Sequence, residues 1–89
     1  MSEASATSYT ATLLSSGWVN NNGVYEYTYT NANLQCGADG TVPPIISFLS
    51  NQEEYSKISS AEATAGTGIV FQCAEAPTAN IGIVIIDVK

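Results

Sequence analysis

IGIVIIDV, residues Ile81–Val88, is the most apolar stretch of the chain and the richest in β-branched residues. Side chains of an extended chain alternate between two faces, and both faces of this stretch are apolar. Such a strand lies inside a sandwich, or between its own core and a neighbouring subunit. A helix is the alternative, but eight residues with six Val or Ile and one Gly favour a strand. We therefore expect a central strand, with Ile83 and Ile85 as core anchors, Val84 and Ile86 on its other face, and Asp87 reaching water.

The length and composition indicate one small folded domain. The chain has 89 residues, of which 45% are hydrophobic and 11% charged. A domain of this size buries only about 60–65% of the surface of its unfolded chain, so oligomerisation or a crosslink would add needed stability. We expect a flexible segment, or a link to an upstream region, at residues 1–7 and the folded domain at residues 8–89.

The charge excludes several classes of partner. The net charge is −6, and Lys57 and Lys89 are the only basic residues. Binding to phosphates needs several cations on one face, so we expect no nucleic acid and no anionic membrane as partners. No stretch approaches the roughly 20 apolar residues of a membrane helix. Met1–Thr7 is too polar for a secretory signal peptide.

The two cysteines, Cys36 and Cys73, permit one disulfide without requiring it. Their spacing is not that of a metal site, and no histidine is present to complete one. Small disulfide scaffolds usually carry four or more cysteines. The pattern therefore favours free, buried thiols.

Short alternating stretches separated by turn signals predict an all-β domain. Asn20–Gly23 is typical of a hairpin turn, because Asn and Gly accept positive φ angles. Pro43 and Pro44 cannot donate ladder hydrogen bonds, so the strand after them begins at a sheet edge or a bulge. The pattern favours a small antiparallel β-sandwich or jelly-roll-like domain. The expected strands are Tyr9–Ser15, Val24–Thr30, Ile45–Leu49, Lys57–Ala63, Ile69–Cys73 and Ile81–Val88.

One helical turn is expected at Asn51–Lys57. Ser50 lies three residues before Glu53, which is the spacing of a capping box. In that motif the serine hydroxyl accepts from the Glu53 amide and the carboxylate accepts from the Ser50 amide. Acidic residues near the start and Lys57 at the end also suit the helix dipole.

Aromatic residues supply the candidate binding surface. Tyr25, Tyr27 and Tyr29 share one face of their predicted strand. Packing at the core edge or in a subunit contact is the favoured interpretation, and stacking on a sugar is the alternative. Trp18 and Phe71 are expected to anchor the core. The candidate oligomer or ligand face consists of Tyr25, Tyr27, Tyr29, Val84 and Ile86.

No arrangement of residues indicates catalysis. Without histidine, neither a Ser-His-Asp nor a Cys-His site can form. The adjacent carboxylates of Glu53 and Glu54 diverge on a helical turn, and Glu62, Glu75 and Asp87 are expected at solvated surface positions. The sequence therefore predicts no enzyme, no cofactor and no metal site.

Five segments resemble the small β-domains of phage fibres. They are Ser16–Asn20 (SGWVN), Glu54-Tyr55, Gly68–Cys73 (GIVFQC), Pro77-Thr78 and Ile81–Asp87 (IGIVIID). Such domains occur at the C-terminal end of head- or tail-fibre proteins in phages and prophages of gut bacteria. The sequence differs from the family pattern at the three tyrosines, where aliphatic residues are usual, and at Cys36.

This resemblance implies a non-catalytic domain of a virion appendage. It implies a homo-oligomer, most often a trimer, near the receptor-binding end, which attaches to a host-surface glycan or protein receptor. The expected location is the virion, assembled in the host cytoplasm. The alternative function is a carbohydrate-binding module of a cell-surface protein that uses Trp18 or the tyrosine face. A third hypothesis, an adhesin or pilin-like subunit, requires an export signal.

Overall fold

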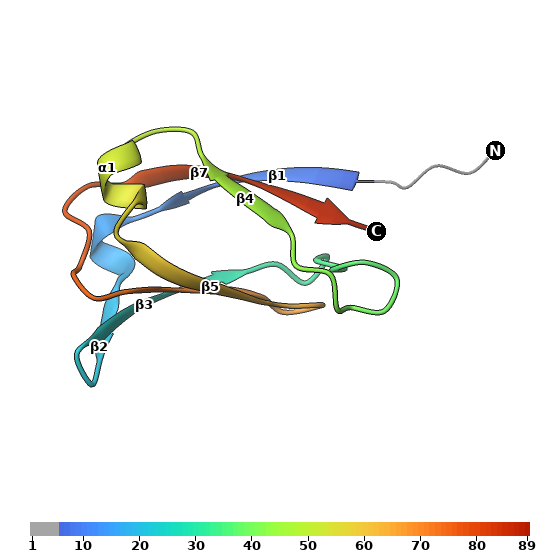
Figure 1. The fold of residues 1–89 in the computed structure, drawn as a ribbon, viewed down its shortest axis with the longest axis horizontal. Coiled ribbons are helices and arrows are strands. Elements are labelled where there is room, and N and C mark those ends of the chain that lie inside the picture. The colour runs from blue at the N-terminus through green and yellow to red at the C-terminus, as the bar shows by residue number, and fades with distance from the viewer. Residues whose placement is uncertain (1–5) are drawn as a thin grey trace.

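The computed structural model describes residues 6–89 and shows two antiparallel sheets packed as a sandwich (Figure 1), which confirms the predicted fold class. One sheet has three strands in the order β1-β7-β4, and the other has four in the order β2-β3-β6-β5. The strands are β1 (Ala6–Leu13), β2 (Val19–Asn21), β3 (Val24–Thr30), β4 (Ile45–Phe48), β5 (Ile58–Thr64), β6 (Gly68–Cys73) and β7 (Ile81–Val88), and the helical turns are η1 (Ser15–Gly17) and α1 (Gln52–Tyr55).

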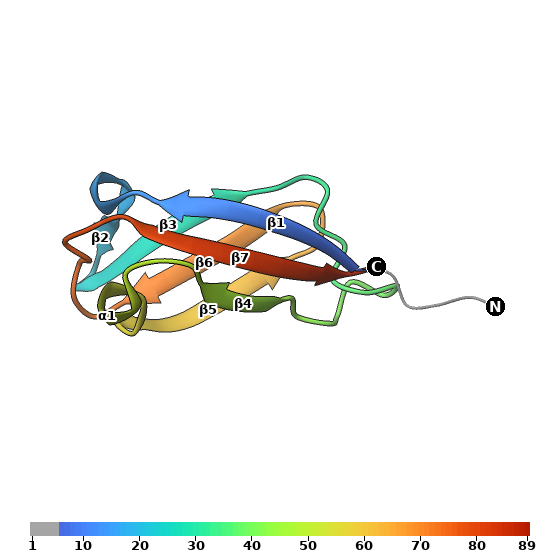
Figure 2. The same cartoon turned by 90° about the horizontal axis from the view of Figure 1, so that it is seen from above.

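The strand β7 lies in the middle of the three-stranded sheet, as its apolar sequence predicted (Figure 2). It is antiparallel to β1 along its whole length, from Leu13 opposite Ile81 to Ala6 opposite Val88. It is also antiparallel to β4. Alternate side chains of β7 are fully buried, and the others are partly exposed on the outer face.

The hydrophobic core fills the space between the two sheets. Burial of apolar surface is the main stabilising contribution in such a core, at about 25 cal/mol for each Å² removed from water. The expected core anchors all lie here, at 9% exposure for Trp18 and 1% or less for the other three. The buried hydrophobic side chains are Leu13, Trp18, Leu34, Cys36, Ile69, Phe71, Cys73, Ile81, Ile83 and Ile85.

Both ends of the described chain lie at one pole of the sandwich, which we call the terminal pole. Ala6 and Val88 are direct partners there. The opposite pole holds α1 and the hairpin between β2 and β3, and we call it the helix pole (Figure 1). The first strand begins at Ala6, inside the segment 1–7 that was expected to be flexible or a link, because pairing with β7 continues to Val88. Residues 1–5 lie outside the described part of the chain.

The hairpin between β2 and β3 forms as its sequence predicted. Asn22 and Gly23 have φ angles of 57° and 88°, the values that a two-residue turn between twisted strands requires. The Asn20 side chain accepts a hydrogen bond from the Gly23 N–H at 2.9 Å. The turn therefore fixes the start of β3 at Val24.

The predicted capping box is wrong, although a helical turn does form. Asn51, the residue before α1, is left-handed with φ of 58°, and no side chain caps the helix. The Ser50 hydroxyl accepts instead from the Gly82 N–H at 3.1 Å, while the Leu49 N–H donates to the Gly82 carbonyl. Ser50 thus extends the contact of β4 with β7, and α1 spans four residues, fewer than expected.

Both cysteines are free and buried, as predicted. Cys36 lies at the terminal pole, where the neighbouring Gly37 N–H donates to the Val88 carbonyl. Cys73 ends β6 opposite Tyr25 and Ile58, next to α1 at the helix pole. The length of the sandwich therefore separates the two thiols.

Candidate functional site

The three tyrosines of β3 face the interior of the sandwich. Their partners on β6 are buried, and paired residues of antiparallel strands share a face. The Tyr27 ring lies 5.4 Å from the Trp18 ring, and its hydroxyl donates to the Thr12 carbonyl. The Tyr29 hydroxyl accepts from the Asn31 side chain at 3.0 Å. The tyrosines thus pack against the core edge and not on an open stacking face. The pairs are Tyr25 with Cys73, Tyr27 with Phe71, and Tyr29 with Ile69.

The other two members of the expected face lie elsewhere. Val84 and Ile86 are on β7, where they alternate with the buried isoleucines and point away from the core. The prediction of one face that combines Tyr25, Tyr27, Tyr29, Val84 and Ile86 is therefore wrong. The sequence showed how side chains alternate along β3 and along β7. It did not show that these strands belong to different sheets, whose outer faces point in opposite directions.

Among residues 6–89, the outer face of the three-stranded sheet carries no charged side chain, and we call it the uncharged face. On this side of the sheet, Ile45 of β4 lies beside Ile86 of β7, and it is 63% exposed. Ile46 and Phe48 are paired with Ile85 and Ile83 and so face inward. The members of the uncharged face, read from the register of the three strands, are Ala6, Ser8, Thr10, Thr12, Ile45, Ser47, Gly82, Val84, Ile86 and Val88.

The outer face of the four-stranded sheet is polar and acidic. Glu26 on β3 is opposite Gln72 on β6, which is opposite Ser60 on β5. The Gln72 side chain donates to the Glu26 carboxylate at 2.7 Å and accepts from the Ser60 hydroxyl at 2.9 Å. Glu62 adds a second carboxylate to this face, opposite Val70. The two sheets therefore present chemically different surfaces.

Trp18 is not available as a binding platform. It follows η1, and its side chain is enclosed by the core. The indole N–H is buried and meets no acceptor among residues 6–89. A ring that binds sugar by stacking must expose one π face, and only 9% of this residue is accessible.

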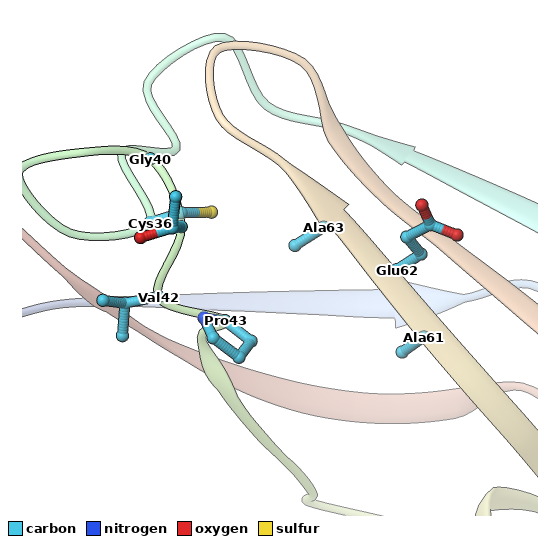
Figure 3. A pocket seen from close by; sticks show the side chains of 8 residues that line it. Cys36, Gly40, Val42, Pro43, Ala61, Glu62 and Ala63 are labelled. Carbon is cyan, nitrogen blue, oxygen red and sulfur yellow. The ribbon is translucent and has the colours of Figure 1, made fainter.

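A shallow hollow of about 210 Å³ lies between the segment 36–43 and β5 (Figure 3). Its walls include Cys36, Val42, Pro43 and small alanine side chains. Glu62 also borders it, but its carboxylate points away from the other lining side chains (Figure 3). Sites that enclose a small molecule usually have volumes of about 300–1,000 Å³ and several convergent polar groups. The hollow has neither property.

Asp87 is buried, at 1% exposure, and the expectation that it reaches water is wrong. Its two carboxylate oxygens accept from the backbone N–H groups of Gln35 and Cys36, each at 2.8 Å. Cys36 and Gly37 have φ angles of 54° and 80°, so the chain turns sharply around the carboxylate. A buried charge is tolerated when such hydrogen bonds satisfy it. Asp87 therefore fastens this loop to the end of β7.

The thiols are shielded and are not activated. Burial raises the pKa of Cys36, and the negative charge of Asp87 raises it further. Burial also raises the pKa of Cys73, although the nearby Lys57 acts in the opposite direction. Since the thiolate is the nucleophilic form, neither site favours nucleophilic chemistry.

Glu54 joins α1 to the segment 74–80 at the helix pole. Its Oε1 accepts from the backbone N–H and the hydroxyl of Thr78, and it forms an ion pair with Lys57 at 3.1 Å. The backbone N–H of Thr78, with Lys57, holds the pKa of the Glu54 carboxyl below its ordinary value. This carboxylate therefore has a structural role at the surface.

Comparison with known proteins gives no relative. No protein-family model, no curated protein and no solved structure matches the chain. Within residues 6–89, no three His, Cys, Asp or Glu side chains are grouped so that they could hold a metal ion. In the same part of the chain, no helix has the length and apolar character needed to cross a membrane.

Proposed function

We propose that this chain is a non-catalytic structural domain of a phage fibre that assembles as a homo-oligomer in the virion. Three copies is the number that the resemblance implies. The observation that carries the proposal is the uncharged face on a chain of net charge −6. An outer sheet face of Val, Ile, Ser and Thr, without a carboxylate, suits contact with a protein surface better than exposure to water.

The distribution of carboxylates supports the choice of copies of the same chain as partners. Glu26 and Glu62 lie on the outer face of the other sheet. Glu53 and Glu54 belong to α1 at the helix pole. Two acidic copies repel each other least where neither carries a charge, so the uncharged face is the favoured contact surface.

The state of the ionisable groups supports a structural role over catalysis. The Asp87 carboxylate accepts hydrogen bonds from two backbone N–H groups in the core. The Glu54 carboxylate accepts from Thr78 and forms an ion pair with Lys57. Both thiols have raised pKa values. Catalytic groups need a cleft and a free reactive atom, and these groups have neither.

The position of the two ends suits a domain held at one pole. With Ala6 beside Val88, the helix pole is left free to face outward. We propose that this pole lies nearest to the host-surface glycan or protein receptor. The carbohydrate-binding module is the weaker alternative, because Trp18 is buried and the tyrosines are directed to the core.

Light scattering at micromolar concentration tests the oligomer. We expect about 28 kDa, three times the 9.3 kDa chain. Val84→Lys should lower this mass by placing a charge on the uncharged face. Val70→Lys is the matched control, because Val70 is also a partly exposed valine that points outward from an inner strand of its sheet. A wild-type mass of 9.3 kDa would refute the homo-oligomer.

A glycan-binding assay tests the alternative function. If a monomer binds a defined glycan and Tyr27→Ala abolishes that binding without unfolding the domain, the carbohydrate-binding module becomes the better description.

A further inference from the structure

The four edge strands differ in their protection against pairing with another chain. Natural sheets protect their edges with prolines, charges, bulges or very short strands. The edge strand β2 has three residues, β4 has four and follows Pro43 and Pro44, and β5 has a bulge between Ile58 and Ser60 and carries Glu62. The edge strand β1 has eight residues, with no proline, no acidic or basic side chain and continuous pairing to β7.

The backbone of β1 has outward groups available for a partner. The Thr12 carbonyl accepts from the Tyr27 hydroxyl and therefore points away from β7. Successive residues of a strand direct their N–H and C=O groups to opposite sides, so those of Thr10, Ser8 and Ala6 also point outward. Within residues 6–89, these three residues make no hydrogen bond on that side.

The other edge of the same sheet exposes apolar side chains. Ile45 on β4 is 63% exposed, Phe48 is 41% exposed, and Leu49 directly after the strand is 59% exposed. No acidic or basic residue lies between Ile45 and Leu49. This edge therefore exposes apolar side chains on both sides of the strand, Ile45 on the outer face and Phe48 on the inner one, that a strand from another molecule could cover.

The uncharged face alone is too small for a stable contact. Three strands about 4.8 Å apart and about 26 Å long span roughly 400 Å² at most. A stable interface buries about 800 Å² on each partner. A contact between copies must therefore include surface beside this face, and the two edges of the same sheet border it directly.

We infer that copies of this chain join head to tail, with the β1 edge of one copy lying along the β4 edge of the next. This inference rests on the proposed homo-oligomer and adds the surfaces that join its subunits. Two different edges in contact form a heterologous interface, which closes into a ring when the rotation between copies allows it. With three copies, the ring covers every exposed edge of the three-stranded sheets and turns their uncharged faces toward the common axis.

Disulfide trapping between the two edges tests this contact. Ser8 on β1 and Ser47 on β4 are exposed members of the uncharged face, and β7 lies between them (Figure 2). Strands on either side of a third are about 9.6 Å apart, beyond the Cα–Cα limit of roughly 7 Å for a disulfide. The two introduced cysteines of one chain therefore cannot form a disulfide with each other. We expect the oxidised double variant Ser8→Cys/Ser47→Cys to form covalent species of two and three chains.

The matched control is Thr28→Cys/Ser60→Cys on the other sheet. These residues are also exposed and point outward. They flank β6 as Ser8 and Ser47 flank β7, and in both pairs the partners on the middle strand are two positions apart. We expect this variant to remain at one chain after oxidation. Equal trapping in both variants, alongside a wild-type mass of about 28 kDa, would overturn the edge contact and leave the homo-oligomer intact.

Two further outcomes separate the possible failures. If Ser8→Cys alone traps two chains efficiently, the β1 edges pair with each other about a two-fold axis, and the head-to-tail contact is wrong. If light scattering gives 9.3 kDa for the wild type, the proposed homo-oligomer itself is refuted.

Discussion

The Oδ1 atom of Asp87 accepts a hydrogen bond from the backbone N–H of Cys36 at 2.8 Å within the core. A second bond, from Gln35 to Oδ2, completes the attachment of the loop. Asp87→Asn replaces one acceptor oxygen with a donor and leaves one backbone N–H unsatisfied. Hydrogen bonds to charged groups contribute about 1.5–3 kcal/mol, so we expect unfolding in urea to show a loss of about 2 kcal/mol.

The control for this prediction is Asp39→Asn. Asp39 is exposed and lies in the same loop region, so its change should stay within about 0.5 kcal/mol. Equal stabilities of the two variants would show that the Asp87 hydrogen bonds do not stabilise the fold.

Glu54 should make the domain sensitive to acid. Its pKa in the folded state is lowered from 4.5, so the folded state favours the ionised form. The stabilisation is present above about pH 4.5 and is lost as the pH falls through the lowered pKa. We expect Glu54→Gln to be less stable than wild type at pH 7 and to lose less stability between pH 5 and roughly pH 3. Urea unfolding across this range measures both effects.

Glu53→Gln is the matched control for acid sensitivity, because its side chain is exposed and adjacent in the sequence. It should follow the wild-type pH dependence closely. The prediction fails if the two glutamine variants have the same acid profile.

Reducing agent should leave the melting temperature unchanged. Both cysteines are free and lie near opposite poles, whereas a disulfide between them would close a 38-residue loop and contribute about 3–4 kcal/mol. Because both thiols are buried with raised pKa values, a thiol reagent at neutral pH should react only as the domain unfolds. Rapid labelling of the folded domain would contradict their burial.

Tyr27 should stabilise the domain through its ring more than through its hydroxyl. The ring packs on Trp18, whereas the hydroxyl makes one exposed hydrogen bond of 3.4 Å to Thr12. We expect Tyr27→Ala to lower the free energy of unfolding by about 2–3 kcal/mol and Tyr27→Phe by less than about 1 kcal/mol. Thermal or urea unfolding of both variants measures the difference. Similar losses for both would assign the stabilisation to the hydroxyl.

Six of the seven strands were predictable from local patterns because their signals are contained within a few residues, whereas the three-residue strand β2 was not predicted. The bounds of β3 and β7 follow from an Asn-Gly turn and from a run of β-branched residues. The edge position of β4 follows from Pro43 and Pro44, which cannot donate to a ladder.

The features that were not predictable depend on distant residues. The burial of Asp87 requires two N–H groups some 50 positions earlier in the chain. Ser50 pairs with Gly82 on β7 and so is not free to cap α1. The tyrosines and Val84 each alternate as expected, but only the strand order places them on separate sheets. In each case, contacts between residues far apart in the sequence determined the structure, and the local sequence pattern did not.

The pairing of Ala6 with Val88 also determines how the domain responds to tension. A force applied between these two residues acts across the strands, along the direction of the hydrogen bonds, and so opens the pairs of β1 and β7 one after another from the terminal pole. Force on strands whose pulled ends lie at opposite poles would instead strain all the pairs together. We therefore expect the domain to unfold at a lower force when it is pulled through Ala6 and Val88 than when it is pulled through residues at opposite poles.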